Sequence, residues 1–516
     1  MQKLASPNGR GTQTAVANHR LSICDNIAYG ENSSHTAAID ILDDDSLLNI
    51  FHLYRPFLIG EDDNDEARLF GGFDRWERGH WWYKLAHVCQ RWRNLILGSA
   101  SYLRLCLVCT KGTPVADMLA HSSPRLPLVV DYYYEDSEVN KEDEERLILA
   151  LEQRDRVRRI RLRMEIWNLQ RIMVAISEEY PILECLIIIT PDRPPSLTLP
   201  ERLQAPHLHH LVLSGFSLPI GSRLLTTAVG LVTLVLIITI PSTYFQPNSL
   251  LQWISFMPQL ETLIIYFFSA DHSRTVERQL THMSIQTITP IALPKLRWFW
   301  FQGVNPYLEA VVRGITCPRL ERLQVFFFEQ ITFSVPHLLQ FMKNTATTET
   351  RNLTFSNAKL DFSSDQVDVA TYPREEFELS QSLHIRVLCL HLDLQVSAMA
   401  QISNSLSQMF STVEHLTLSY EPHNMSSEEH NEVDPRTWRR ILRSFINAKT
   451  LRIEEGLEEE IARCLRMDDD GGEVPLDLLP ELHELLYSRS SHTDEYYTSF
   501  INARHKAGRP ITLVDL

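Results

Sequence analysis

The sequence predicts an α/β fold, α+β over the whole chain, in which a short helical module precedes a solenoid of helix–turn–strand units. Three observations support this prediction. One short apolar pattern recurs from Val157 almost to the C-terminus, prolines precede many of its copies, and the segment before residue 106 has helical spacing without the repeat. A chain of 516 residues is too long for one compact core, so several domains or one repeat array are expected.

The recurring pattern is an apolar residue, two variable positions, a leucine or other large apolar residue, one variable position and a final apolar residue. Its last two apolar positions are two residues apart, which is the alternation of a half-buried strand. The copies are Val157-Ile160-Leu162, Leu183-Leu186-Ile188, Leu208-Leu211-Leu213, Leu231-Leu234-Leu236, Leu260-Leu263-Ile265, Leu296-Phe299-Phe301, Leu320-Leu323-Val325, Ile385-Leu388-Leu390, Val413-Leu416-Leu418, Leu451-Ile453 and Leu482-Leu485.

A helix is expected before each strand. Proline cannot continue a helix, so a proline in front of a copy marks the change from helix to strand. Such prolines are Pro181, Pro206, Pro258, Pro294, Pro318 and Pro480. Upstream of one of them, SLLQWISFM places Leu250, Leu251, Ile254 and Met257 on one helical face. A unit of this kind buries its apolar face only by stacking on its neighbours.

From about residue 150 to 516 these units resemble leucine-rich-repeat solenoids. Their uneven length and the lack of a regular Asn or Cys after the strand depart from the family, which leaves curvature and repeat count open. No Gly-rich nucleotide turn follows a strand, which disfavours a doubly wound sheet. The expected organisation is a disordered tail over 1–37, a helical domain over 38–105 with an acidic insertion around 55–80, a connecting segment over 106–150 and the solenoid over 151–516.

Two apolar clusters characterise the segment in front of the repeats. ILDDDSLLNIFHLYRP places Leu47, Leu48, Ile50 and Phe51 on one helical face, after acidic residues suited to a helix N-terminus. WWYKLAHVCQRWRNLI brings Leu85, Val88, Cys89, Trp92 and Ile96 to helical spacing.

Together the two clusters resemble the F-box. Val88-Cys89-Gln90-Arg91-Trp92-Arg93 matches the second half of that family's pattern closely, whereas Asp43 stands where the family has proline. The resemblance implies a substrate receptor that binds the Skp adaptor, and with it the cullin, of an SCF ubiquitin ligase, while the solenoid binds an unknown target. The residues implied for the module's core and its adaptor interface are Leu42, Leu47, Leu48, Ile50, Phe51, Leu85, Val88 and Trp92. The alternative is a repeat scaffold for protein–protein interaction whose N-terminal helices only cap the solenoid.

Neither an enzyme nor a cofactor is expected, since no nucleophile elbow, phosphate loop or kinase signature is present. The strongest metal-like signal is Cys106-x-x-Cys109, with His87 and Cys89 upstream. Structural zinc usually requires two such pairs, and LRLCLVCT alternates like a strand, so no metal site is expected.

The chain carries 49 basic and 65 acidic residues, a net charge of −16, which argues against a general nucleic-acid or membrane-surface binder. Scattered cysteines, a polar N-terminus and the absence of a long apolar run predict a cytoplasmic or nuclear protein. The basic run of Arg154, Arg156, Arg158, Arg159, Arg161 and Arg163 could line phosphates. Our preferred interpretation is a solvent face paired with the acidic residues from Glu142 to Glu145.

A partner-binding surface is predicted from the strand phase. If the repeat leucines face the helices, the residues between them face the other side of the sheet. These are Ile264, Tyr266, Phe268, Trp298, Trp300, Phe326 and Phe328. Neighbouring strands would gather them into one aromatic patch, which is typical of a binding site. A phase slip of one residue, or a cover formed by residues 269–292, would remove this surface.

Overall fold

The computed structural model divides into two compact units, residues 1–54 and 55–516. The residues that it describes are 42–54, 81–100, 102–103, 105–133, 139–190, 197–239, 244–268, 290–328, 332–346, 355–373, 382–421, 433–454, 456–465, 477–487 and 493–515. The predicted tail over 1–37 and the acidic insertion around 55–80 lie outside them.

A 16-stranded, mostly parallel sheet organises the second unit. Repeat leucines stand opposite one another across it, as in the register Leu186–Leu211–Leu234–Leu263. In spatial order the strands are β1 (Leu107–Cys109), β2 (Leu128–Tyr132), β3 (Val157–Arg163), β4 (Cys185–Ile189), β6 (His210–Ser214), β8 (Thr233–Ile238), β9 (Thr262–Phe267), β11 (Trp298–Gly303), β13 (Arg322–Phe327), β16 (Leu383–Leu388), β15 (Gln366–Tyr372), β14 (Asn357–Ser363), β17 (His415–Glu421), β18 (Thr450–Ile453), β19 (Glu484–Tyr487) and β20 (Thr512–Asp515). Two short parallel pairs accompany the sheet, β5 (Leu197–Thr198) with β7 (Phe216–Ser217) and β10 (Ile291–Ala292) with β12 (Ile315–Thr316).

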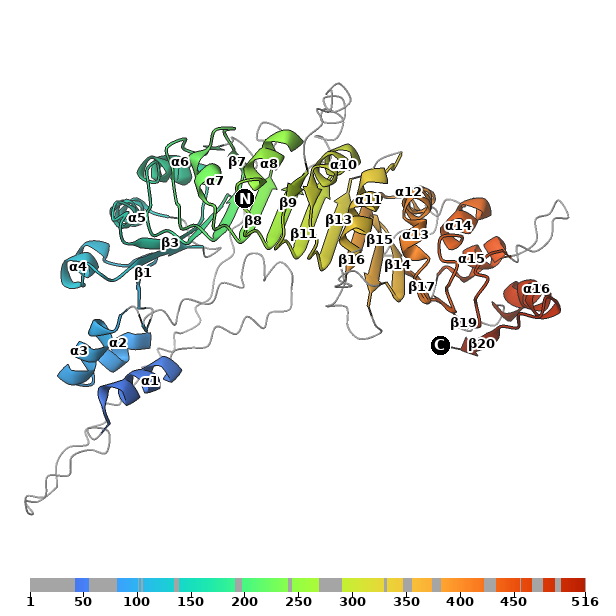
Figure 1. Ribbon diagram of the computed structural model, residues 1–516, viewed down its shortest axis with the longest axis horizontal. Helices are drawn as coiled ribbons and strands as arrows, with labels where there is room; N and C mark the ends of the chain where they lie inside the picture. Colours follow the sequence, from blue (N-terminus) through green and yellow to red (C-terminus); the bar gives the residue numbers. More distant parts are fainter. Residues whose placement is uncertain are drawn as a thin grey trace, which may run out of the picture. The chain divides into compact units, whose positions relative to one another are not determined.

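The described helices from α4 (Val115–His121) onward cover one face of this sheet, and none of them lies on the other face (Figure 1). They alternate with the strands, as the repeat predicts. They are α4 (Val115–His121), α5 (Lys141–Leu151), α6 (Ile166–Ala175), α7 (Arg223–Thr227), α8 (Pro247–Ile254), α10 (Asn305–Arg313), α11 (Pro336–Ala346), α12 (Leu392–Ser405), α13 (Ser407–Phe410), α14 (Pro435–Leu442), α15 (Glu458–Leu465) and α16 (Thr493–Lys506). The chain is therefore a mixed α/β protein with a solenoid-like arrangement. We call the helix-free side of the sheet the open face.

The core lies between the sheet and these helices, and its strand phase confirms the prediction. Leu263, Ile265 and Phe267 of β9 are buried, and so are Leu323, Val325 and Phe327 of β13. The copy Ile385-Leu388-Leu390 is an exception. Leu383, Ile385 and Val387 are the buried hydrophobic residues of β16, whereas Leu390 is exposed. The predicted phase of this copy is wrong by one residue after Ile385.

An antiparallel hairpin interrupts the parallel order. β14 and β15 pair antiparallel, β15 pairs antiparallel with β16, and β14 pairs parallel with β17. The hairpin thus adds two strands between consecutive repeat units without breaking the ladder. We expected a connecting segment over 106–150, but β1 and β2 come from this range and pair in parallel with each other and with β3.

The segments before the sheet contain three short helices: α1 (Asp44–Tyr54) in the first unit, and α2 (Trp81–Ala86) and α3 (Gln90–Gly98) in the second. The continuous helical spacing predicted for Leu85 to Ile96 is interrupted, because α2 ends before Val88 and α3 begins after Cys89. The Cys89 Sγ accepts the Trp92 amide N–H at 3.4 Å and caps α3. Among the described residues, no helix is both long and apolar enough to cross a bilayer.

Candidate interaction surfaces

The open face of the central strands carries an apolar cluster of its own. Its buried members come from four adjacent strands: Cys185 and Ile187 of β4, Val212 of β6, Val235 of β8 and Ile264 of β9. Packed against them and only partly buried are Tyr133, Ile189, Ile237, Trp298 and Trp300. The open face of the sheet therefore holds a second small core. The side chains that cover this core remain partly accessible to solvent.

The predicted aromatic residues continue this surface. Trp298 and Trp300 stack with ring centroids 6.5 Å apart, and Trp300 contacts Tyr266 at 6.1 Å and Phe326 at 5.6 Å. Tyr266 also meets Phe268, whose side chain is 43% exposed. The phase slip considered above is thereby excluded for these strands.

Two details differ from the prediction. Phe328 is 4% exposed and is not an accessible member of the surface, and Ile264 is equally closed to solvent. The aliphatic members on β4, β6 and β8 were missed by sequence reasoning. Their signal was present, because CLIII is apolar at every position and TLVLII is apolar from its second residue on, which is typical of strands buried on both faces.

Charged groups border the surface at both ends. On β3 the Arg161 guanidinium lies 4.8 Å from the Tyr133 ring centroid and donates from Nη1 to the Asp131 Oδ2 at 3.2 Å. Burial raises the pKa of Asp131 even though Arg161 lowers it. On β16 the Arg386 guanidinium lies 4.7 Å from the Phe326 ring centroid.

Asp368 of β15 joins the second border. Its Oδ1 accepts the Arg386 Nε–H at 2.7 Å and lies 2.7 Å from the His384 Nε2. Burial works to raise the pKa of Asp368, but the hydrogen bonds and charges of His384 and Arg386 outweigh it, so this pKa is lowered.

The basic run that leads into β3 and continues along it has partners other than those predicted. Arg154 pairs with Glu178, Arg158 with Glu184 at 2.8 Å, and Arg161 with Asp131. The acidic stretch instead pairs within α5 and with α6, as in the 2.9 Å contact between Arg171 and Glu144. The expected pairing with the residues from Glu142 to Glu145 is wrong. These residues belong to α5, whereas Arg159, Arg161 and Arg163 alternate with the core residues Ile160 and Leu162 of β3 and lie on the open face.

The structure separates the predicted adaptor-binding residues by burial. Leu47 and Phe51 are buried, Ile50 is 43% exposed and Val88 is 59% exposed. The intermediate ones are Leu42, Leu48, Leu85 and Trp92. Sequence reasoning missed Leu53 and Tyr54, which are 70% and 57% exposed and follow Ile50 at helical spacing on α1.

The second unit ties α2 to α3 and to the segment before β1. The Arg93 Nε donates to the Ala86 carbonyl at 3.0 Å. The buried Trp82 donates from Nε1 to the Cys106 carbonyl at 3.4 Å. Burial raises the pKa of Cys109 to about 12, so its thiol is protonated at neutral pH. No group of three or more metal-ligating side chains occurs in the part of the chain that the structure describes.

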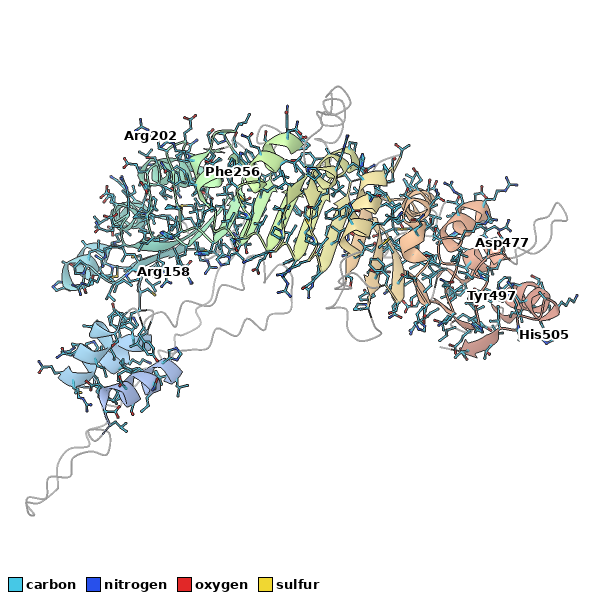
Figure 2. The ribbon with its side chains drawn as sticks, in the orientation of Figure 1. Arg158, Arg202, Phe256, Asp477, Tyr497 and His505 are labelled. Atoms are coloured by element: carbon cyan, nitrogen blue, oxygen red, sulfur yellow. The ribbon has the colours of Figure 1, made fainter. Side chains whose placement is uncertain are left out.

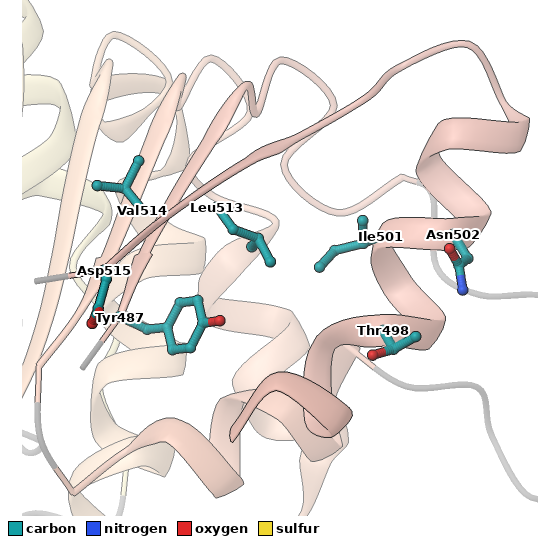
Figure 3. A pocket seen from close by; sticks show the side chains of 7 residues that line it. All are labelled: Tyr487, Thr498, Ile501, Asn502, Leu513, Val514 and Asp515. Carbon is teal, nitrogen blue, oxygen red and sulfur yellow. The ribbon is translucent and has the colours of Figure 1, made fainter. Parts of the chain in front are cut away.

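A small pocket of about 340 Å³ lies between α16 and the last two strands (Figure 3). Ile501 of α16 and Leu513 of β20 point toward each other across it, and Tyr487 also lines it. Leu513 lies in the last strand of the sheet and is 40% exposed. The pocket gathers no catalytic or ligand-binding constellation.

No protein-family model matches the sequence, and no curated protein matches it. Among solved structures, the leucine-rich repeat-containing protein LegL7 from Legionella pneumophila aligns with 77% of this chain and 97% of its own length, at 9% identity and a TM-score of 0.24. At so low a score this likeness carries no weight, and the solenoid-like assignment comes from the strand order and register of this chain.

Proposed function

We propose that this protein is a non-enzymatic interaction adaptor, and more specifically a substrate receptor of an SCF-type ubiquitin ligase. The N-terminal helices would recruit a Skp adaptor, and the open face of the sheet would hold the target. One observation carries the ligase half of this proposal: α1 exposes Ile50, Leu53 and Tyr54 on one face while burying Leu47 and Phe51.

An exposed apolar helix face of this kind suits a helix-in-groove interaction with aliphatic and aromatic anchors. Val88, exposed in the turn between α2 and α3, belongs to the motif that resembles the F-box. The buried residues Leu47 and Phe51 would serve packing, so substitutions there would report on folding and not on the interface.

The target-binding half is supported by the open face. Aromatic and aliphatic side chains from six adjacent strands form one apolar surface there, bordered by arginines. Trp, Tyr and Arg are the residues that most often anchor protein interfaces.

The test is copurification of the full chain with a Skp adaptor. Ile50→Asp with Leu53→Asp should reduce adaptor recovery at least about tenfold, because two charges would enter an apolar interface. Val174→Asp is the matched control, since Val174 is 73% exposed on α6 of the solenoid. Equal recovery by all three proteins would favour the scaffold alternative, in which the N-terminal helices only cap the solenoid.

A further inference from the structure

The open-face side chains form straight rows across the strands, because the register is nearly constant. One row contains Ile237, Tyr266, Gln302, Phe326 and Arg386. Each of these residues stands directly opposite the next one, on the neighbouring strand. On the other side of Ile237 stands Ser214 of β6, and on the next two strands Arg163 of β3 stands opposite Ile189 of β4. The row thus has an arginine at each end and mostly apolar residues between.

Arginine side chains gather at both ends of this surface. Among the described residues, β3 directs Arg159, Arg161 and Arg163 to the open face, with Asp131 of β2 beside them. At the other end, Arg322 of β13 and Arg386 of β16 share the face with Asp368. The two arginine groups contrast with the net charge of −16 of the whole chain.

The five strands between the arginine groups lack such charges. The described open-face residues of β4, β6, β8, β9 and β11 include neither Lys nor Arg; His210 is their one titratable base. Burial lowers the pKa of His210 to about 4, so it is neutral at physiological pH.

This charge pattern decides between two classes of partner. A nucleic acid carries a phosphate on every nucleotide. The phosphates in the middle of a bound strand would therefore lie on apolar side chains, where no positive charge would neutralise them. A protein segment can place its carboxylates at its ends and apolar side chains between them. From β3 to β16 there are seven strand steps of about 4.8 Å, or roughly 34 Å, which about ten extended residues span.

We propose that the open face binds an extended protein segment that is apolar or aromatic in its middle and acidic at both ends. The Arg159/Arg163 group would receive one acidic end and the Arg322/Arg386 group the other. The central apolar residues would lie on Ile189, Ile237, Tyr266, Trp300 and Phe326. This inference names the chemistry of the target and rests on the proposed target-binding role of the open face.

The experiment measures fluorescence anisotropy of the full chain with three labelled probes. The first is a peptide with three glutamates at each end of an apolar run of about eight residues, and the second replaces every glutamate by glutamine. The third is a single-stranded oligouridine of matched length. The acid-flanked peptide should bind at least about tenfold more tightly than the glutamine-flanked one, with a difference that shrinks in high salt.

Variants of the protein locate the effect. Arg159→Gln with Arg163→Gln should remove most of the preference for glutamate, because it neutralises one end of the surface. Arg202→Gln is the control, since Arg202 is an exposed arginine on the helix-covered side (Figure 2). This control variant should keep the full preference.

Equal binding of the two peptides, or tighter binding of the oligouridine, would overturn the inference. A preference for glutamate that survives Arg159→Gln with Arg163→Gln would also contradict it. Adaptor copurification is measured separately and involves the N-terminal helices, not the open face. If the wild-type protein binds the adaptor but fails the peptide test, the proposed acidic and apolar composition of the target is refuted. If the wild-type protein does not bind the adaptor, the ligase role is refuted.

Discussion

Arg504, fully buried in α16, donates from Nη1 to the carbonyl of Leu479 at 3.1 Å, and Leu479 has a φ of +48°. Left-handed backbone is unfavourable for a leucine. The same guanidinium donates from Nη2 to the carbonyls of Pro480 at 3.2 Å and Leu482 at 2.9 Å. One side chain thereby holds the turn that leads into β19.

Arg504→Met should destabilise the C-terminal units by about 2–4 kcal/mol, because three carbonyls lose their charged donor. A solenoid transmits such a loss mainly to neighbouring units. Hydrogen exchange should therefore accelerate in β18, β19 and β20 and stay unchanged in β4 to β9. Arg509→Met, at an exposed position, is the control. Faster exchange throughout the sheet would contradict this local role.

The repeat was predictable because each strand is periodic in itself and each copy repeats the same phase. The hairpin of β14 and β15 was not predicted, since NAKLDFS and QVDVATY alternate without the spacing of the repeat. The two-residue turn of Ser364 and Asp365 between two alternating runs was the available hairpin signal. Only part of the open-face surface was predictable. Its aromatic residues follow from the alternation of side chains along the repeat strands, whereas Asp368 lies opposite Arg386 only because the hairpin, which was not predicted, places it there.

Gly215 should tolerate no side chain. Its φ is +79°, and a Cβ there would lie 2.4 Å from the Cγ2 of Thr190. Gly112 has a similar φ of +77° but nothing within 4 Å of its Cβ position. Gly112→Ala should therefore cost about 1–2 kcal/mol for backbone conformation alone. Gly215→Ala should cost about 1–3 kcal/mol more because of the clash.

Urea unfolding midpoints of the two glycine variants measure this difference. Thr190→Ser removes the clashing methyl and keeps the hydroxyl, so Thr190→Ser with Gly215→Ala should recover most of the extra loss. Similar midpoints for Gly215→Ala and Gly112→Ala would show that packing against Thr190 is unimportant.

Trp300 and Phe268 should separate stability from binding. Trp300 packs against the buried open-face cluster, so Trp300→Ala should lower stability by about 2–4 kcal/mol. Phe268 is 43% exposed, so Phe268→Ala should cost less than about 1 kcal/mol. Thermal unfolding checks both values. In the peptide assay Phe268→Ala should weaken binding severalfold while its melting temperature stays close to that of the wild type.

Asp368 should make the open-face border sensitive to acid. Its folded-state pKa is lowered by His384 and Arg386 against the opposing effect of burial, while an unfolded aspartate has a pKa of about 3.9. The ionised carboxylate therefore stabilises the folded state above about pH 4. This contribution is lost as the pH falls through the lowered folded-state value.

Asp368→Asn should thus cost about 1–3 kcal/mol at neutral pH, and the cost should shrink toward zero as the pH falls below about 4. Urea midpoints of the wild type and the variant, measured at matched pH values from neutral to about pH 3, give this difference directly. Asp365→Asn is the control, since Asp365 is exposed in the turn between β14 and β15. A cost that is the same at every pH would mean that the shape of the side chain, and not its charge, holds Arg386 and His384 in place.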